Sequence, residues 1–299
     1  MHTPLRLLFA SILFSVMSTA GADPYRVDSA GEGRAVYLVP GLASPGWVWE
    51  DLADRLREAG YRTHVLTLAG FAGQPPLAGD GPFLPAVRDA LAADLAAEAG
   101  PDSASGRGPE PIVIGHSLGG FLAFWLAATA GEHLAGAIAV DGVPYISALG
   151  DPSVKPQSQR QGAQQTASFM ASLTPEQYAQ QNRMSIETMV ADEEMRKRVA
   201  ADSGRSDPAT VGRAVAEMMT TDLRPQMSEI DIPLLLVQAA DSGGNEAMRA
   251  AYARQVEPIP DHRHVVAEQG RHFVQLDDPE FLAREVLAFL ATLETDDEP

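Results

Sequence analysis

Cysteine is absent from this chain of 299 residues, which excludes disulfide bonds, thiolate catalysis and zinc sites built on cysteine. Basic residues are also scarce: 22 Lys and Arg stand against 40 Asp and Glu, a formal net charge of −18. Nucleic acids and anionic membranes need clustered cations, so we expect neither as a partner. Because 45% of the residues are hydrophobic, the chain can form one large α/β domain with an insertion, or two modest domains.

A long hydrophobic run is also lacking, because the apolar stretch at residues 7–17 is shorter than the roughly 20 residues of a membrane-spanning helix. Arg6 precedes this stretch, and Ala20-Gly21-Ala22 follows it with the small residues of a signal-peptidase site. We therefore expect residues 1–22 to be a signal peptide. This segment would direct export to the periplasm or the exterior, and its cleavage would leave the mature protein without a stable membrane anchor. An uncleaved N-terminal anchor is the alternative.

The rest of the chain alternates between short apolar runs and helical patterns. Strands are expected at residues 35–39, 62–68, 111–114, 134–140, 234–238 and 263–267, and helices at 49–59, 83–99, 120–127, 246–256 and 279–293. Such alternation is typical of βαβ units, so it predicts an α/β fold. We expect a mostly parallel sheet with helices on both faces.

Residues 145–227, which we call the insertion, interrupt this rhythm. They contain no convincing strand; a polar loop is expected at 150–165, and helices near 166–172, 175–190, 193–201 and 208–220. The predicted organisation is therefore a core of residues 23–144 and 228–299 with a helical cap between its two parts. Six of the ten Met residues lie between 170 and 219, and flexible Met side chains suit an adaptable apolar pocket. We expect Met170 and Met184 to contact substrate; ordinary helix packing is the alternative.

The most specific motif is Gly115-His116-Ser117-Leu118-Gly119, a G-x-S-x-G pattern between an apolar strand and an apolar helix. A serine on such a turn exposes its hydroxyl for attack on a carbonyl carbon. Ser117 is therefore the predicted nucleophile, and His116 is expected to pack away from it.

A serine nucleophile needs a base and a group that orients the base. His272 is the predicted base, in the loop between the last strand and the last helix. Asp241, after the strand that follows the insertion, is the predicted acid, giving the chain order Ser, Asp, His. Asp141 ends an earlier strand and is the alternative acid. His262 and His264 have no carboxylate at ligand spacing, so we expect no metal site.

Four blocks together resemble the α/β-hydrolases, in particular single-chain esterases and lipase-like enzymes with a cap. They are Val39-Pro40-Gly41-Leu42 with Trp47 and Trp49, the turn at residues 68–73, the motif at 115–119, and the histidine block at 270–279. The resemblance implies an oxyanion hole made by the backbone N–H groups of Leu42 and Leu118. The family commonly has His where this chain has Pro40, so the hydrogen bonds of that His are missing here. Trp47 is expected to line the substrate pocket, with core packing as the alternative for it and for Trp49 and Trp125.

These features predict an exported serine hydrolase that cleaves a small carboxylic ester, or a thioester, without a cofactor. A lactonase and a cofactor-free haloperoxidase or lyase use the same fold and catalytic residues. A binding protein that keeps the three residues but turns over slowly belongs to a different class. The sequence leaves the oligomeric state and the natural substrate open.

Overall fold

The computed structural model describes residues 23–99, 110–240 and 246–295, which form one seven-stranded sheet. The strands are β1 (Tyr25–Ala30), β2 (Ala35–Val39), β3 (Arg62–Leu68), β4 (Ile112–His116), β5 (Gly136–Val140), β6 (Leu234–Ala239) and β7 (His262–Ala267). Their order in the sheet is β1-β3-β2-β4-β5-β6-β7. Strand β1 is antiparallel to β3, and the other neighbouring pairs are parallel. The predicted mostly parallel sheet is confirmed.

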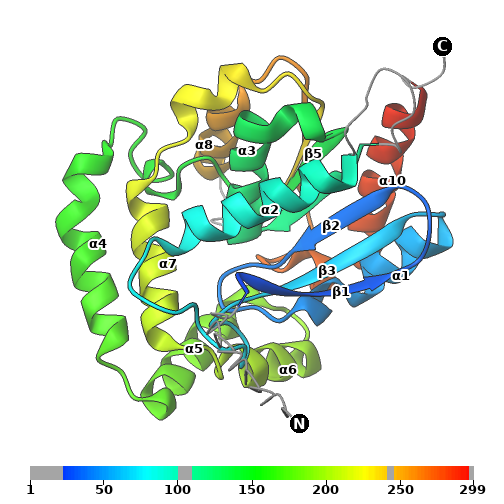
Figure 1. The fold of residues 1–299 in the computed structure, drawn as a ribbon. Helices are drawn as coiled ribbons and strands as arrows, with labels where there is room; N and C mark the ends of the chain where they lie inside the picture. Colours follow the sequence, from blue (N-terminus) through cyan, green and yellow to red (C-terminus); the bar gives the residue numbers. More distant parts are fainter. Residues whose placement is uncertain (1–22, 100–109, 241–245, 296–299) are drawn as a thin grey trace, which may run out of the picture.

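Helices cover both faces of this sheet, as predicted (Figure 1). The core helices are α1 (Glu50–Glu58), α2 (Phe83–Ala99), α3 (Leu118–Ala130), α8 (Glu246–Val256), α9 (Val274–Asp277) and α10 (Pro279–Thr295). Helices α2, α3 and α8 pack on one face, and α1 and α10 pack on the other. Both faces need cover because the side chains of a buried strand alternate between them. In β4, Val113 joins the first apolar layer, while Ile112 and Ile114 join the second.

Strand β1 is the one strand of the sheet that the sequence pattern did not predict. Its sequence YRVDSA has one half-buried residue, and the rest are exposed. A strand at the sheet edge needs few apolar side chains because it pairs with one neighbour only. The hydrogen bonds to β3 therefore form it without the hydrophobic pattern that marks the central strands.

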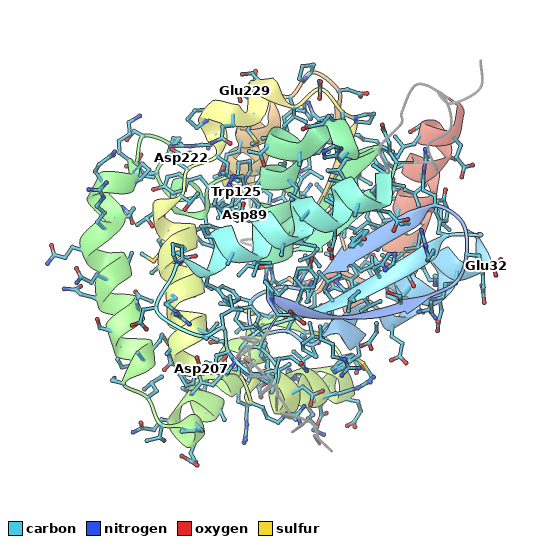
Figure 2. The ribbon with its side chains drawn as sticks, in the orientation of Figure 1. Glu32, Asp89, Trp125, Asp207, Asp222 and Glu229 are labelled. Atoms are coloured by element: carbon cyan, nitrogen blue, oxygen red, sulfur yellow. The ribbon has the colours of Figure 1, made fainter. Side chains whose placement is uncertain are left out.

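The insertion lies between β5 and β6, and it is helical as expected. It contains η3 (Ile146–Ala148), α4 (Pro156–Ala171), α5 (Pro175–Met189), α6 (Glu193–Ser203), α7 (Pro208–Thr220) and η4 (Arg224–Glu229). Thr174 forms a capping box with Gln177, and Asp207 caps the backbone N–H of Thr210 at the start of α7, where Figure 2 labels it. None of the helices in the described ranges combines the length and the hydropathy that a membrane crossing requires.

The polar segment 150–165 is largely helix rather than the expected loop, since α4 begins at Pro156. Pro at the first helical position favours this start. Ala163 is the one fully buried residue of α4, which packs against α7 and leaves its Gln-rich face in water. A helix exposed on most sides carries little apolar periodicity, so the pattern of the sequence did not reveal it.

Candidate active site

Ser117 occupies the sharp turn between β4 and α3. Its backbone has φ 54° and ψ −112°, a strained conformation that pushes its side chain out of the strand. A side chain at position 115 would overlap the carbonyl of Gly119, and one at position 119 would overlap the carbonyl of Val39. Both glycines of the motif are therefore required by space, and Ser117 is left partly open to the cavity described below.

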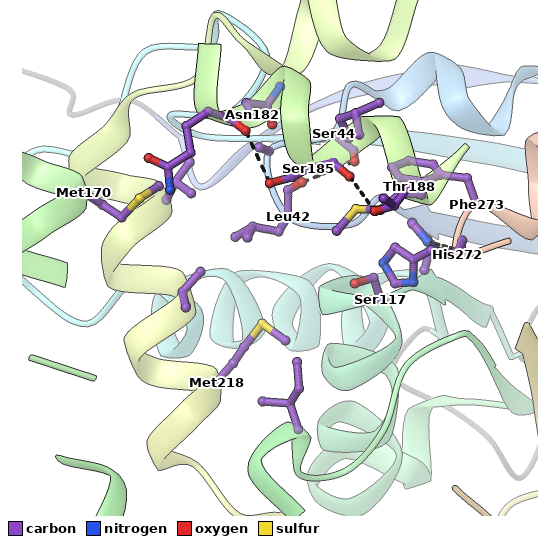
Figure 3. Close-up of a pocket in the computed structure, with 18 of the residues that line it drawn as sticks. Leu42, Ser44, Ser117, Met170, Asn182, Ser185, Thr188, Met218, His272 and Phe273 are labelled. Atoms are coloured by element: carbon purple, nitrogen blue, oxygen red, sulfur yellow. Dashed lines mark hydrogen bonds between the residues drawn. The ribbon is translucent and has the colours of Figure 1, made fainter. Parts of the chain in front are cut away.

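His272 lies beside Ser117 and is held by a buried carboxylate. Nδ1 of His272 is 2.6 Å from Oδ2 of Asp141, whose side chain is fully buried. The other oxygen of Asp141 accepts a hydrogen bond of 3.0 Å from the backbone N–H of Ala239. Figure 3 shows the imidazole of His272 next to the hydroxyl of Ser117. Since Nδ1 donates to the carboxylate, Nε2 is the nitrogen left to accept a proton.

The carboxylate on His272 therefore comes from the alternative residue of the sequence analysis. Asp141 follows the last residue of β5 directly, whereas Asp241 lies outside the described residues. Strands β5 and β6 are parallel neighbours in the sheet, so their last residues, Val140 and Ala239, lie at the same edge. Asp141 itself has a left-handed backbone, with φ 47°.

The loop after β2 approaches Ser117 closely at Gly41. A Cβ on Gly41 would lie 2.8 Å from Nδ1 of the buried His116 and 3.2 Å from Cβ of Ser117, so a side chain at position 41 would force its neighbours to move. The next residues form a tight turn, in which the N–H of Ser44 donates to the carbonyl of Gly41 at 3.1 Å and Ala43 has φ 59°. Leu42 lies within this turn, and Leu118 is the first residue of α3, where N–H groups have no intrahelical acceptor.

His116 is buried behind Ser117 and contacts the same histidine. Its Nε2 donates to the backbone carbonyl of His272 at 2.9 Å, and the two rings lie 4.7 Å apart. The ring also packs against Phe273 and Trp49. Burial lowers the pKa of His116 to about 3, so this side chain is neutral at physiological pH. The packing role expected for His116 thus includes a hydrogen bond that fixes the backbone of His272.

A cavity of about 550 Å³ opens above Ser117 and His272. The core supplies its floor, and the insertion supplies its walls (Figure 3). Helix α7 contributes an apolar row, made of Val211, Val215, Met218 and Met219. Helix α5 contributes a polar row, made of Gln181, Asn182, Ser185 and Thr188. Among the described residues that line the cavity there is no Asp, Glu, Lys or Arg.

Of the three residues expected to contact substrate, Met170 lines this cavity and the other two lie elsewhere. Met184 is on the outer face of α5 and is 62% exposed. The indole of Trp47 donates to Asp202 at 2.7 Å and stacks under Arg198, so it joins the core to α6. Trp49 is buried in the core, and Trp125 packs under Arg88 near the point where Figure 2 labels it.

The polar row on α5 was missed by the sequence reasoning. Its signal was available, because positions 181, 185 and 188 are spaced by four and three residues and so share one helix face. A polar helix face ordinarily contacts solvent, so the spacing alone does not predict that these side chains line a cavity. Within the described part of the chain, no group of three or more His, Asp or Glu side chains is placed to hold a metal ion.

Comparison with known proteins agrees with this architecture. A pimeloyl-[acyl-carrier protein] methyl ester esterase of Aliivibrio fischeri is 26% identical over 264 residues, which cover 87% of this chain and 95% of that protein. An N-formylmaleamate deformylase of Pseudomonas putida is 27% identical, covering 88% and 90%.

Solved structures with the same fold include a hydrolase from Pseudomonas aeruginosa, with TM-score 0.71, 18% identity and coverage of 89% and 93%. An enol-lactonase from Burkholderia xenovorans has TM-score 0.69, 17% identity and coverage of 89% and 95%. The model of the alpha/beta hydrolase family matches residues 36–285. The chain therefore belongs to the alpha/beta hydrolase family.

Proposed function

We propose that this protein is an exported serine hydrolase that cleaves carboxylic esters, or thioesters, through Ser117, His272 and Asp141. The observation that carries the proposal is that Ser117 and His272 lie at the floor of one cavity, with the buried Asp141 hydrogen-bonded to His272. The curated relatives named above include an esterase, which supports ester hydrolysis as the reaction.

In the proposed reaction, Oγ of Ser117 attacks the ester carbonyl and Nε2 of His272 takes its proton. The buried carboxylate of Asp141 keeps Nδ1 of His272 protonated and stabilises the imidazolium that forms. His272 then returns the proton to the leaving alcohol, and an acyl group remains on Ser117. A water molecule, activated by the same histidine, releases the acid.

The negative charge that develops on the carbonyl oxygen requires donors that are already in place. We assign this role to the backbone N–H groups of Leu42 and Leu118, which flank Ser117. The tight turn at Gly41 and the helix start after Ser117 fix both groups, so they need not reorganise during the reaction. Losing one donor of this kind typically costs about 3 kcal/mol in the barrier.

The insertion acts, in this proposal, as a lid that selects the acyl chain. Its walls are largely apolar on the α7 side, and closure over Ser117 would exclude water and strengthen the hydrogen bonds to the oxyanion. Export is proposed on the basis of residues 1–22, which lie outside the described residues. No cofactor takes part in the proposed steps.

Covalent labelling with a fluorophosphonate tests this function, combined with p-nitrophenyl esters of increasing chain length. Rapid labelling at Ser117 with steady turnover is the expected result. A lactone belongs in the same panel, because the solved neighbours include an enol-lactonase. Saturable ligand binding without labelling or turnover would show a binding protein instead.

A further inference from the structure

The two walls of the cavity differ in chemistry, and they lie on different sides of the catalytic groups. Figure 3 shows Ser185, Thr188 and Asn182 above Ser117, with Met218 on the opposite wall. The apolar row of α7 is buried or half-buried, whereas Ser185 and Thr188 are exposed at the mouth of the cavity. Helix α5 also presents Tyr178, Ile186 and Met189 to the cavity, so its polar side chains form one row rather than a whole wall. A bound ester therefore meets an apolar surface on the α7 side and a polar row at the mouth.

The C-terminal end of α5, where the polar row ends, is hydrogen-bonded to the loop that carries His272. The carbonyl of Met189, the residue after Thr188, accepts a hydrogen bond of 3.3 Å from the N–H of Phe273, the residue after His272. Two further contacts hold this end of α5: Nη1 of Arg271 donates to the carbonyl of Val190, and the N–H of Ala191 donates to Asp277. The polar row thus ends next to the group that protonates the leaving alcohol. We assign the alcohol half of the ester to this side and the acyl half to the apolar row.

The polar row offers hydrogen-bond acceptors on its hydroxyls, beside the N–H donors of the Gln181 and Asn182 amides. The hydroxyl of Ser185 donates to the carbonyl of Gln181 at 3.4 Å, and the hydroxyl of Thr188 donates to the carbonyl of Ser185 at 3.1 Å. The amide nitrogen of Asn182 donates to Ser203 at 2.6 Å. When a side-chain hydroxyl uses its proton on its own helix, its lone pairs remain for a ligand. An alcohol that carries further O–H groups suits this row, because a hydroxyl can donate to the Ser and Thr oxygens and accept from the amides.

The absence of ionic side chains from the described lining also limits which alcohols the cavity can bind. The described lining carries no ionic side chain, and His116 is neutral because its burial lowers its pKa to about 3. No described lining side chain would neutralise a charged alcohol there, and the net charge of −18 repels an anionic one.

We propose that the substrates are monoesters of an apolar acid with a small, uncharged polyol. The polyol hydroxyls donate to Ser185 and Thr188, and the acyl chain lies along Val211, Val215 and Met218. This inference rests on the proposed esterase function and specifies its substrate class. In the reaction the bond between the acyl carbon and the polyol oxygen breaks, that oxygen takes the proton from His272, and the acyl carbon bonds to Oγ of Ser117.

A matched pair of substrates tests the inference: glycerol 1-monooctanoate and propyl octanoate, which share the acyl chain and the length of the alcohol. The readout is the ratio of their kcat/KM values. We expect a ratio above ten in the parent enzyme. The variants Ser185→Ala and Thr188→Val should each lower the ratio about threefold to tenfold, the size of one lost hydrogen bond.

Ser172→Ala is the matched control. The hydroxyl of Ser172 also donates to a carbonyl of its own helix, that of Phe169 at 2.7 Å, but it does not line the cavity, so its ratio should equal that of the parent. A parent ratio near one, with rapid turnover of p-nitrophenyl octanoate, would overturn the inference and leave the esterase function intact. An unchanged ratio in both cavity variants would also overturn it. Absence of any ester turnover would instead count against the proposed function.

Discussion

Oδ2 of Asp141 lies 2.6 Å from Nδ1 of His272, and Oδ1 of the same carboxylate accepts from the N–H of Ala239 at 3.0 Å. One side chain thereby joins the ends of two neighbouring strands, β5 and β6, to the loop that carries the histidine. Asp141 makes these contacts from a backbone conformation with positive φ, which is strained for a residue other than glycine. Its burial keeps water from competing for either oxygen.

Replacing this carboxylate gives the first prediction. Asp141→Asn should lower kcat for p-nitrophenyl esters by about 10³-fold or more, because the amide no longer favours the tautomer with a proton on Nδ1 of His272. Asp241→Asn should change kcat less than threefold. The measurement is steady-state kinetics on both variants, and the reverse ranking would return the acid role to Asp241.

The second prediction concerns Ser117. Ser117→Ala should abolish fluorophosphonate labelling and ester turnover, while the far-UV circular dichroism and Tm stay close to those of the parent. The side chain is partly open to the cavity, so its hydroxyl contributes little to packing. Residual activity within tenfold of the parent would contradict its role as the nucleophile.

The third prediction follows from the buried His116. Burial lowers its pKa in the folded protein to about 3, below the ordinary histidine value of 6.5, so between these values the unfolded chain binds one more proton than the folded chain. Stability therefore rises with pH across this window and is lost as the pH falls through it.

In His116→Gln this contribution disappears. The free energy of unfolding, measured by urea titration between about pH 4 and pH 6, should depend on pH less steeply than in the parent, by up to about 1.4 kcal/mol per pH unit. Asp141 and His272 face position 116 in both proteins, so the comparison isolates the contribution of the His116 side chain. Parallel curves for the two proteins would show that His116 does not carry this pH dependence.

The fourth prediction separates inward from outward methionines of the insertion. Met218→Gln and Met170→Gln should lower kcat/KM for long-chain p-nitrophenyl esters about tenfold relative to short-chain ones, because each buried methylene contributes about 0.8 kcal/mol. Met184→Gln should leave the chain-length profile unchanged, since Met184 is 62% exposed. Identical profiles in all three variants would leave the insertion without a part in recognition.

The fifth prediction concerns export. The mature protein should begin at Asp23, directly after Ala20-Gly21-Ala22. N-terminal sequencing of secreted or periplasmic material decides this. Membrane-bound material that retains Met1 would indicate an uncleaved anchor.

The order of the core elements could be predicted because β2, β4, β5 and β6 are fully buried and so have continuous apolar sequences. The same reasoning fails at the periphery. Strand β1 and helix α4 are held by one neighbour each and remain mostly in water, so the hydrophobic pattern that marks a buried element is absent from both.

In the candidate site, too, some residues could be predicted from the sequence and others could not. Ser117 and His272 stand in local patterns that identify them, and the structure brings both to one cavity. Choosing between Asp141 and Asp241 requires knowing which carboxylate reaches the histidine. In the sequence, each comes directly or almost directly after a strand, and the two strands are parallel neighbours. The left-handed backbone at position 141 cannot be inferred from the residues beside it.

The separation between the floor and the walls of the cavity has a consequence for how such a protein could diversify. The groups assigned to bond cleavage come from three loops of the core, whereas most residues that line the walls fall between 146 and 219. One continuous stretch of the gene thus encodes most of the surface that a substrate would meet. Recombination that exchanged this stretch between homologous genes would transfer a substrate preference in a single event, without disturbing the contact between Asp141 and His272.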